Sequence, residues 1–328
     1  MKILILNTTK RKYGGKVYES MIGEVLSNNF EVEFINAGIK SGKFKYLTAP
    51  IVLWNIFKIS RRKNFDLIIR DFESSLFFNK KPAKNIAILH HLDYSFAPLW
   101  IKFFSSIFAK IILRNLRKFE TVVVVSKYWE NYFKEKRYKN VYLIYNAFKL
   151  DDFNFSSEEI EEFKKKYNLA GKPIIYIGNC QKAKGVVGSY RALKDLDIHL
   201  VTSGEQRVKI PAKNLEVEYK DYLRLLKASS IVVTMSQFKE GWCRTAHEAM
   251  LLKTSVIGSG RGGMKELLEG GKQIICEDFN SLKEKVEYLL KNPEIREKMG
   301  QDGYDFAKDF TLERFKKDWQ ELINKVIY

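Results

Sequence analysis

The sequence predicts an α/β protein with two doubly wound domains, and three observations carry that prediction. Short apolar runs alternate with amphipathic stretches, the apolar runs are continuous, and the whole pattern starts again after a charged break. Continuous apolar runs are typical of strands covered on both faces, and the stretches between them indicate crossovers in a mostly parallel sheet. In the first half the runs are KILIL (2–6), EVEFI (31–35), DLIIR (66–70), IAIL (86–89), TVVVV (121–125) and VYLIY (141–145).

The break between the two series lies at residues 146–173. Ser156 and Glu159 have the spacing of a capping box for a charged helix. A second series of predicted strands follows: PIIYIG (173–178), HLVTSG (199–204), LEVEY (215–219), SIVVTM (230–235), SVIG (255–258) and QIIC (273–276). We therefore expect one domain at residues 1–153 and another at 154–310. A last helix at 311–328, with Thr311 as its N-cap, is expected to pack back on the first domain.

The composition predicts a reduced, cytoplasmic protein. The chain has 328 residues and is 45% hydrophobic, enough for sizeable cores. Cys180, Cys243 and Cys276 are too far apart for a disulfide framework or a zinc site, so we expect reduced thiols. The N-terminus lacks the apolar region of a signal peptide, and no apolar run approaches the roughly 18 residues needed to span a bilayer.

The positive charge is concentrated in the first half of the chain. Residues 1–150 hold 27 Lys and Arg against 11 Asp and Glu, a balance of +16, whereas residues 151–328 hold 30 against 28, a balance of +2. This asymmetry indicates an anionic partner, either a membrane surface or nucleic acid, or else a merely lysine-rich surface. A basic nucleic-acid-binding protein is the main alternative, but the chain lacks RNP-type aromatics, a helix-turn-helix and zinc spacing.

Two stretches, residues 43–63 and 99–119, combine aromatic residues with basic ends. Both are similar to amphipathic segments that lie in an anionic membrane interface. The alternative is that their apolar faces pack on the sheet. We expect a peripheral enzyme at the inner face of the cell membrane, acting on a lipid or a lipid-linked glycan.

The segment VIGSGRGGMKELLEGGKQIICED (256–278) has the letters of a dinucleotide fingerprint. Gly258, Gly260 and Gly263 follow an apolar run, and Glu277 comes about twenty residues after the first glycine. The helix expected after Gly263 is too short for an ordinary crossover, and the segment stands late in its domain. An NAD-dependent oxidoreductase is therefore a weaker alternative.

The segment just upstream, MSQFKEGWCRTAHEAM (235–250), carries a sharper pattern. It places Glu240 in a loop and Glu248 on the following helix, so both acids can face a ligand at the helix N-terminus. Backbone N–H groups at Trp242, Cys243 and Arg244 would meet phosphate or hydroxyl oxygens there. The alternative is a helix with an acidic first turn, which its dipole favours.

These residues resemble the donor-site signature of retaining glycosyltransferases of the GT-B fold, family 4. The matching positions, in order, are Ser236, Glu240-Gly241, Glu248-Ala249-Met250, Gly262-Gly263 and Glu266. Further matches are Tyr13-Gly14-Gly15, VVVVSKYWENYF (122–133), VYLIYNAFKLDDF (141–153) and YIGNCQKAKG (176–185). The resemblance implies two Rossmann-like domains facing each other across a cleft. It also implies transfer of a sugar, with retention, from a nucleotide-diphosphate sugar to a hydroxyl acceptor.

The resemblance also assigns roles to individual residues. It implies that Glu248 binds the nucleotide ribose, that Glu240 lies beside the donor sugar, and that Lys184 neutralises the leaving diphosphate. It further implies that backbone groups surround the donor, at Gly14, Gly15, Gly241, Trp242, Cys243, Gly262 and Gly263.

One position departs from the resemblance. Asn179 stands where the family usually has arginine, and an amide cannot replace a guanidinium against a diphosphate. Lys182, two residues before Lys184, is a candidate to compensate. We expect Lys182→Ala and Lys184→Ala each to weaken donor binding.

Two further features complete the predictions. His90 and His91 follow the IAIL strand at its carboxyl end, where open α/β sheets place ligands, and at least one of them is expected near the reacting sugar. Asp195-Leu196-Asp197 has the letters of a metal motif but lies before a strand, so we expect a turn. Nothing else assembles a divalent-cation site, and we expect activity without a metal or cofactor.

Overall fold

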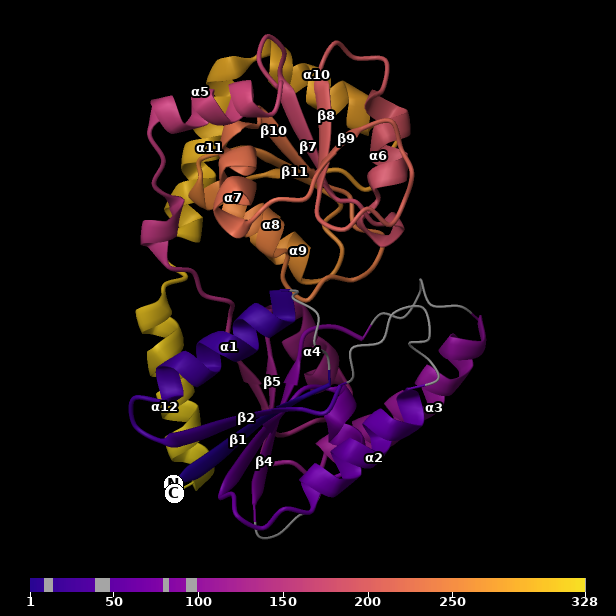
Figure 1. Ribbon diagram of the computed structural model, residues 1–328, viewed down its shortest axis with the longest axis vertical. Helices are drawn as coiled ribbons and strands as arrows, with labels where there is room; N and C mark the ends of the chain where they lie inside the picture. Colours follow the sequence, from indigo (N-terminus) through magenta and orange to yellow (C-terminus); the bar gives the residue numbers. More distant parts are fainter. Residues whose placement is uncertain (9–13, 39–47, 79–82, 93–98, 328) are drawn as a thin grey trace. The chain divides into compact units, whose positions relative to one another are not determined.

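The computed structural model describes residues 1–8, 14–38, 48–78, 83–92 and 99–327, with the side chains of residues 99–105 excepted. It divides into two compact units (Figure 1). Unit 1 is Met1–Ala147 with Leu312–Tyr328, and unit 2 is Phe148–Thr311. The boundary falls earlier than the expected position after residue 153, because the short helix η2 (Leu150–Phe153) contacts helix α8 of unit 2.

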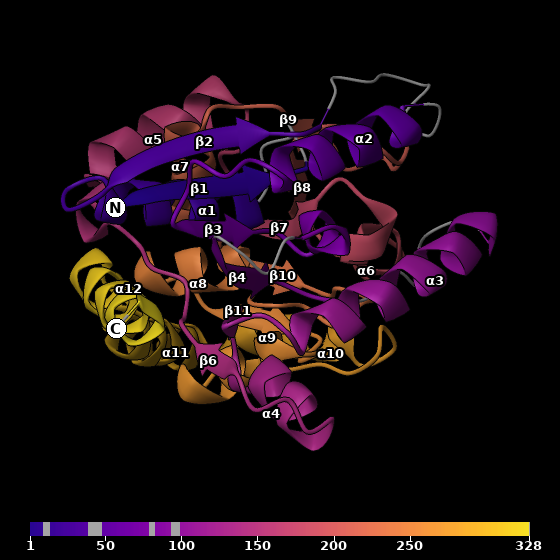
Figure 2. The ribbon, with the colours of Figure 1, turned by 90° about the horizontal axis from the view of Figure 1, so that it is seen from below.

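Unit 1 contains a six-stranded parallel sheet in the order β2-β1-β3-β4-β5-β6. Its strands are β1 (Lys2–Asn7), β2 (Glu31–Asn36), β3 (Leu67–Arg70), β4 (Lys84–Leu89), β5 (Thr121–Val124) and β6 (Val141–Leu143). Its helices are α1 (Gly14–Leu26), α2 (Ala49–Ser60), η1 (Glu73–Leu76), α3 (Leu99–Leu116), α4 (Lys127–Glu135) and α12 (Leu312–Ile327), on both faces of the sheet (Figures 1 and 2). Strand order reverses between β1 and β3, which is where a doubly wound sheet opens a crevice.

The last helix, α12, is part of the core of unit 1. Tyr18 of α1 makes an edge contact with Phe315, at 5.1 Å between ring centroids, and with Trp319. Its hydroxyl donates to the carbonyl of Ile144 over 3.0 Å. At the other end of α12, Lys84 Nζ donates to the carbonyls of Val326 and Ile327, which satisfies acceptors that a helix C-terminus leaves open.

Unit 2 contains a second six-stranded parallel sheet, in the order β12-β11-β10-β7-β8-β9. Its strands are β7 (Ile174–Asn179), β8 (His199–Ser203), β9 (Lys213–Leu215), β10 (Ile231–Thr234), β11 (Val256–Gly258) and β12 (Ile274–Ile275). Its helices include α5 (Ser157–Lys166), η3 (Lys182–Lys184), α6 (Val186–Leu193), α7 (Tyr219–Ala228), α8 (Arg244–Leu251), α9 (Gly263–Gly270), α10 (Leu282–Lys291) and α11 (Pro293–Ala307). Here strand order reverses between β7 and β10.

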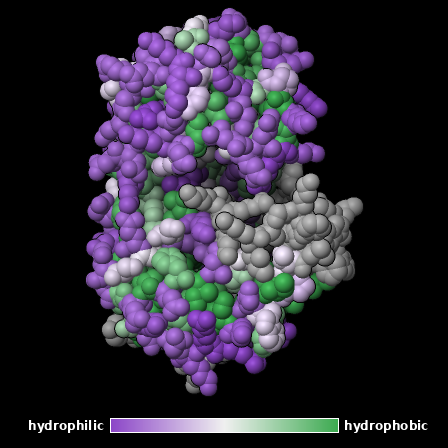
Figure 3. All heavy atoms as spheres, viewed as in Figure 1, coloured by the Kyte–Doolittle hydropathy of each residue, from purple (hydrophilic) through white to green (hydrophobic). Residues whose placement is uncertain are grey.

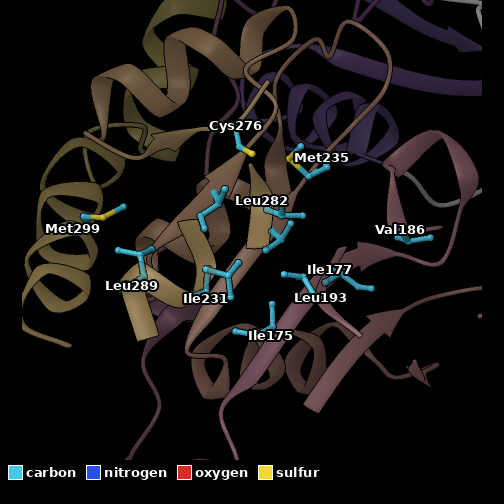
Figure 4. Packing of buried hydrophobic residues seen from close by; sticks show 13 residues of the cluster. Ile175, Ile177, Val186, Leu193, Ile231, Met235, Cys276, Leu282, Leu289 and Met299 are labelled. Atoms are coloured by element: carbon cyan, nitrogen blue, oxygen red, sulfur yellow. The ribbon is translucent and has the colours of Figure 1, made fainter. Parts of the chain in front are cut away.

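The core of unit 2 joins its strands to the helices on one face of the sheet. Side chains of β7 and β10 meet those of α6 and α10 in one apolar cluster (Figure 4). The cluster includes Ile175, Ile177, Val186, Leu193, Ile231, Leu282 and Leu289, all fully buried. Several of the continuous apolar runs form strands that are buried at every position, namely β3, β5 and β10, and the predicted α/β class with two doubly wound domains is confirmed.

Local predictions are mostly confirmed, with one correction. Ser156 and Glu159 form both bonds of the capping box, and the Asp195–Asp197 segment is a turn. The predicted strand LEVEY is wrong beyond its first residue, because β9 ends at Leu215 and α7 begins at Tyr219. The extended Glu218 accepts from the amide of Tyr222, and this bond starts a helix where we expected a strand to continue.

The described parts of the two aromatic, basic stretches contain α2 and α3, and the apolar side chains described on these helices are only partly buried. Ile56 and Ile112 lie in the cores of unit 1. Other large apolar side chains of the two helices are exposed, namely Ile51, Trp54, Ile107, Phe108 and Ile111. Hydrophobic patches also interrupt the hydrophilic surface of the face drawn in Figure 3. Among the helices that the structure describes, none combines the length and the apolar character needed to cross a membrane.

Candidate functional site

The principal candidate site of unit 2 lies where its strand order reverses. Asn179 ends β7, and Ser236 follows β10 within two residues of the strand end. The carboxyl ends of two strands on either side of a reversal form the usual ligand crevice of a doubly wound sheet. Helix η3 after β7 and the loop 236–243 after β10 bring further side chains to the same place.

Lys184 and Glu240 form an ion pair at this point. Lys184 Nζ lies 2.7 Å from Glu240 Oε1, and the hydroxyl of Ser236 donates to the same oxygen. The side chain of Glu240 is 8% exposed and that of Lys184 is 31% exposed. Burial acts to lower the pKa of Lys184, but the neighbouring carboxylate outweighs it, so the pKa lies above its ordinary value. Lys184 is therefore a fixed positive charge at the edge of the crevice.

The backbone of Glu240 is tied to the glycine loop that we predicted as a wall of the site. The amide of Glu240 donates to the carbonyl of Arg261 over 3.1 Å, and the amide of Gly263 donates to the carbonyl of Glu240 over 2.9 Å. Gly262 has φ +69°, and a Cβ there would lie 2.5 Å from the carbonyl oxygen of Glu240. Only glycine fits this contact, which brings the two predicted loops together.

The N-terminus of α8 is held by a histidine that the sequence analysis missed. His247 Nδ1 accepts from the indole N–H of Trp242 over 3.1 Å, and Nε2 donates to the carbonyl of Ala307 over 3.1 Å. Its ring stacks on Phe148, with 4.1 Å between ring centroids. Burial lowers the pKa of His247 to about 3, so the ring is neutral. No sequence motif marks this residue, and its role depends on contacts that become visible only in the structure.

The predicted backbone positions Gly241, Trp242 and Cys243 are all buried beside this helix. Burial is the main cause that raises the pKa of the Cys243 thiol to about 12, and the nearby Glu240 carboxylate also contributes. A thiol in this state does not ionise near neutral pH, so Cys243 is a packing residue rather than a nucleophile.

Glu248 is buried on α8 and is held by three donors of the described residues. The phenol hydroxyls of Tyr219 and Tyr222 donate to its two carboxylate oxygens, each over 3.1 Å. Arg244, one turn earlier on α8, lies 3.4 Å from Oε1. Burial raises the pKa of Glu248, while Arg244 and the tyrosine hydroxyls oppose the shift.

The remaining predicted residues of unit 2 lie nearby with fewer contacts. Lys182 is exposed on η3, and Asn179 is half-buried. Gly260 and Gly262 both have positive φ, whereas Glu277 of the dinucleotide fingerprint is exposed beyond β12.

The predicted residues of unit 1 lie at the carboxyl ends of its strands. Gly14 and Gly15 begin α1, with Gly15 buried. His90 follows β4 and is half-buried, 5.3 Å from the Tyr18 ring between centroids, whereas His91 is exposed. Tyr13 falls outside the described residues.

A buried acidic group also lies at the β1/β3 reversal of unit 1, and the sequence analysis did not identify it. Asp71, after β3, accepts from the amide and the hydroxyl of Thr8, over 2.6 and 2.7 Å. Glu19 of α1 is 2% exposed, and burial, with the nearby Asp71, raises its pKa to about 8. In the described part of the chain, no group of three or more His, Cys, Asp or Glu side chains is arranged to hold a metal ion.

Comparison with known proteins finds similarity to one enzyme class. Residues 157–306 match the family described as "Glycosyl transferases group 1". An uncharacterized glycosyltransferase of Methanocaldococcus jannaschii is 26% identical over 307 residues, which cover 85% of this chain and 82% of that protein.

Two other similar proteins have a name or a title that mentions PP-undecaprenol or UDP-glucose. The GalNAc-alpha-(1->4)-GalNAc-alpha-(1->3)-diNAcBac-PP-undecaprenol alpha-1,4-N-acetyl-D-galactosaminyltransferase of Campylobacter jejuni is 24% identical over 197 residues, 54% of each chain. The fold matches the crystal structure of Anabaena HepE in complex with UDP-glucose, with a TM-score of 0.80, 16% identity, and coverage of 99% of this chain and 100% of that one. The nucleic-acid-binding and oxidoreductase alternatives find no support in these similarities.

Proposed function

We propose that the chain, which has the GT-B fold of its structural neighbours and is similar to group 1 glycosyltransferases over residues 157–306, is a retaining glycosyltransferase of the family 4 type. In this proposal it takes a sugar from a nucleotide-diphosphate sugar and transfers it to a hydroxyl acceptor. UDP-glucose in the HepE structure supports a donor of this class.

The observation that carries the proposal is the Lys184–Glu240 ion pair at the β7/β10 reversal. Negative charge builds on the diphosphate as the glycosidic bond breaks, and a pre-positioned ammonium group stabilises that charge. Lys184 supplies such a group at the ligand end of the sheet. Glu240 then lies beside the sugar, and Glu248, on the next helix, is the candidate partner for the ribose hydroxyls.

We propose that the reaction needs neither a metal ion nor a cofactor. Lys184 is the candidate cation for the diphosphate, together with the exposed Lys182 two residues before it. In other enzymes a divalent metal supplies this positive charge. Chelation with EDTA is expected to leave the rate unchanged. Loss of activity in EDTA that Mg²⁺ or Mn²⁺ restores would contradict this part of the proposal.

We propose a lipid-linked or membrane-associated glycan as the acceptor, at the inner face of the cell membrane. The basic charge of the first half of the chain and the exposed apolar side chains of α2 and α3 support this choice. The name of the Campylobacter relative, which includes PP-undecaprenol, supports it as well. The protein is expected to co-sediment with anionic liposomes at low salt and to remain in solution with neutral ones.

A thermal-melting panel of UDP-, GDP- and ADP-sugars, with NAD for comparison, tests the donor class. Stabilisation by one of the sugar nucleotides, and by its diphosphate, with no response to NAD is the expected result. The anomeric configuration of the product, read by NMR, tests retention. Stabilisation by NAD alone would overturn the proposal.

A further inference from the structure

Two tyrosines of α7 converge on the carboxylate of Glu248. Tyr219 and Tyr222 are three positions apart and therefore share one face of the helix. Their rings lie 6.1 Å apart between centroids, inclined by 29°. Each hydroxyl donates to a different oxygen of Glu248, Tyr219 to Oε1 and Tyr222 to Oε2, over 3.1 Å. No motif used in the sequence analysis includes either residue.

The two phenols have different surroundings. Because the single proton of the Tyr222 hydroxyl is donated to Glu248, its oxygen accepts from the hydroxyl of Thr245 over 3.1 Å, and its ring makes an edge contact with Tyr176 of β7. Tyr219 is the first residue of α7 and is 46% exposed. Burial raises the pKa of both phenols well above the ordinary value, so both stay protonated and act as donors. Tyr222 is thus held in place by its contacts, and Tyr219 lies on the solvent side of the Glu248 carboxylate.

The contacts of the described residues leave room on Glu248 for a ligand. A carboxylate has about four acceptor positions, two on each oxygen. Tyr219 and the long contact from Arg244 share Oε1, while Tyr222 alone occupies Oε2. One position on Oε2 stays open, and the 3.4 Å contact from Arg244 is the weakest of the three. A pair of neighbouring hydroxyls could therefore bind if the arginine moved aside onto Phe148, whose ring it already covers at 4.2 Å.

We propose that Tyr219 and Tyr222 are positioning residues that hold the Glu248 carboxylate in the orientation needed to accept the two hydroxyls of the donor ribose. The proposal rests on the nucleotide-sugar function proposed above. Without the phenols, a buried carboxylate can turn about its terminal torsion, which has a broad energy profile, and its oxygens no longer meet the diol. In this proposal the two tyrosines affect recognition of the ribose alone, and not of the diphosphate bound at Lys184.

The experiment measures binding of UDP, GDP and ADP and of their 2′,3′-dideoxy counterparts to the full-length protein by calorimetry. The ligand that wild type binds best is then tested with Tyr219→Phe and Tyr222→Phe. Each variant is expected to bind the ribonucleotide about tenfold more weakly, because a hydrogen bond to a charged group is lost. Binding of the dideoxy ligand is expected to change less than about twofold, and in a Glu248→Gln background the tyrosine substitutions are expected to add nothing further.

Tyr167→Phe is the matched control. The hydroxyl of Tyr167 donates to Asp221 over 3.0 Å, so this variant also removes a phenol–carboxylate bond to α7, but away from Glu248. It is expected to bind both ligands as wild type does. Equal weakening of ribonucleotide and dideoxynucleotide, or unchanged ribonucleotide binding, would overturn the inference and leave the proposed function intact. Failure of wild type to bind any of the nucleoside diphosphates would instead overturn the proposed function and, with it, this inference.

Discussion

Lys184 Nζ lies 2.7 Å from Glu240 Oε1, across 56 positions of sequence. The resemblance gave these residues separate roles, one at the diphosphate and one beside the sugar. In the structure they are one ion pair. The contact lies at the ends of β7 and β10, and under the proposed function a diphosphate shares or displaces Glu240 to reach the ammonium group.

Lys184→Ala is expected to weaken nucleoside diphosphate binding by about ten- to a hundredfold, because it removes a charged partner and leaves Glu240 buried without its cation. Lys182→Ala is expected to have a smaller effect, since Lys182 is exposed and surface charges contribute about 1 kcal/mol or less. Calorimetry measures both. Lys194, exposed at the end of α6, provides a control that should bind as wild type does. Equal affinity of wild type and the double variant at positions 182 and 184 would refute the role of these lysines.

Gly262→Ala is expected to displace the Glu240 loop and to lower donor affinity at least tenfold. A Cβ at this position would meet the backbone of Glu240 at 2.5 and 2.8 Å, and φ is +69°. Gly171→Ala separates the two causes, because Gly171 has φ +84° but no atom within 4 Å of the added Cβ. The control should lose only about 1–2 kcal/mol of stability from backbone strain, with donor binding intact. Comparable donor affinities in the two variants would contradict this account.

Much of the fold follows from the sequence, because a buried parallel strand such as TVVVV is apolar at every position and needs no partner to be recognised. The capping box at Ser156 and Glu159 is equally local. The motif named Glu240 and Gly262 together from the sequence, and the structure brings their two loops into contact. What the sequence could not predict depends on contacts between distant segments. Tyr219 looked like the end of a strand, and its bond to Glu248 exists only because α7 packs on α8. The pKa values of His247 and Glu19 are shifted mainly by burial, which no short sequence pattern specifies.

Unit 1 is expected to lose stability as the pH rises from 4.5 to about 8, because of Glu19. Its pKa is 4.5 in the unfolded chain and about 8 in the folded protein, so in this window the folded state keeps a proton that the unfolded chain has released. The contribution is about 1.4 kcal/mol for each pH unit. Hydrogen exchange of unit 1 peptides at pH 5 and pH 8 measures it. Glu19→Gln should flatten the dependence of stability on pH. Glu24 is exposed on the same helix, so Glu24→Gln should leave this dependence unchanged.

Unit 2 is expected to show the opposite dependence because of His247. Its pKa falls from 6.5 to about 3 on folding, so between these values acid protonates the unfolded chain and not the folded one. Lowering the pH from 6.5 towards 3 therefore destabilises this unit, by about 1.4 kcal/mol per unit of pH from this residue. His247→Gln should weaken protection of unit 2 at pH 7 and reduce the further loss on acidification. An unchanged acid response in the variant would argue against a neutral buried imidazole.

Trp54→Ala is expected to reduce binding to anionic liposomes by about tenfold. The side chain is 60% exposed on α2, and moving a large apolar side chain into a membrane contributes about 1.5–3 kcal/mol. Tyr288→Ala is the control, because Tyr288 is 48% exposed on α10 of unit 2, outside the basic half of the chain. Co-sedimentation at low salt measures both. If both variants bind as wild type does, α2 is not part of the membrane-binding surface.

The chain leaves unit 1 after Ala147 and returns to it at Leu312, so unit 2 is an insertion within a discontinuous domain. The two ends of the insertion are bridge partners, with the amide of Phe148 donating to the carbonyl of Phe310 over 3.0 Å. We therefore expect that segment 148–311 folds as a separate protein, and that it can be exchanged for the same segment of a relative at a single pair of adjacent junctions. A fragment that stops at residue 147, by contrast, exposes Tyr18 of α1, which Phe315 and Trp319 cover, and should aggregate unless residues 312–328 are supplied as a peptide.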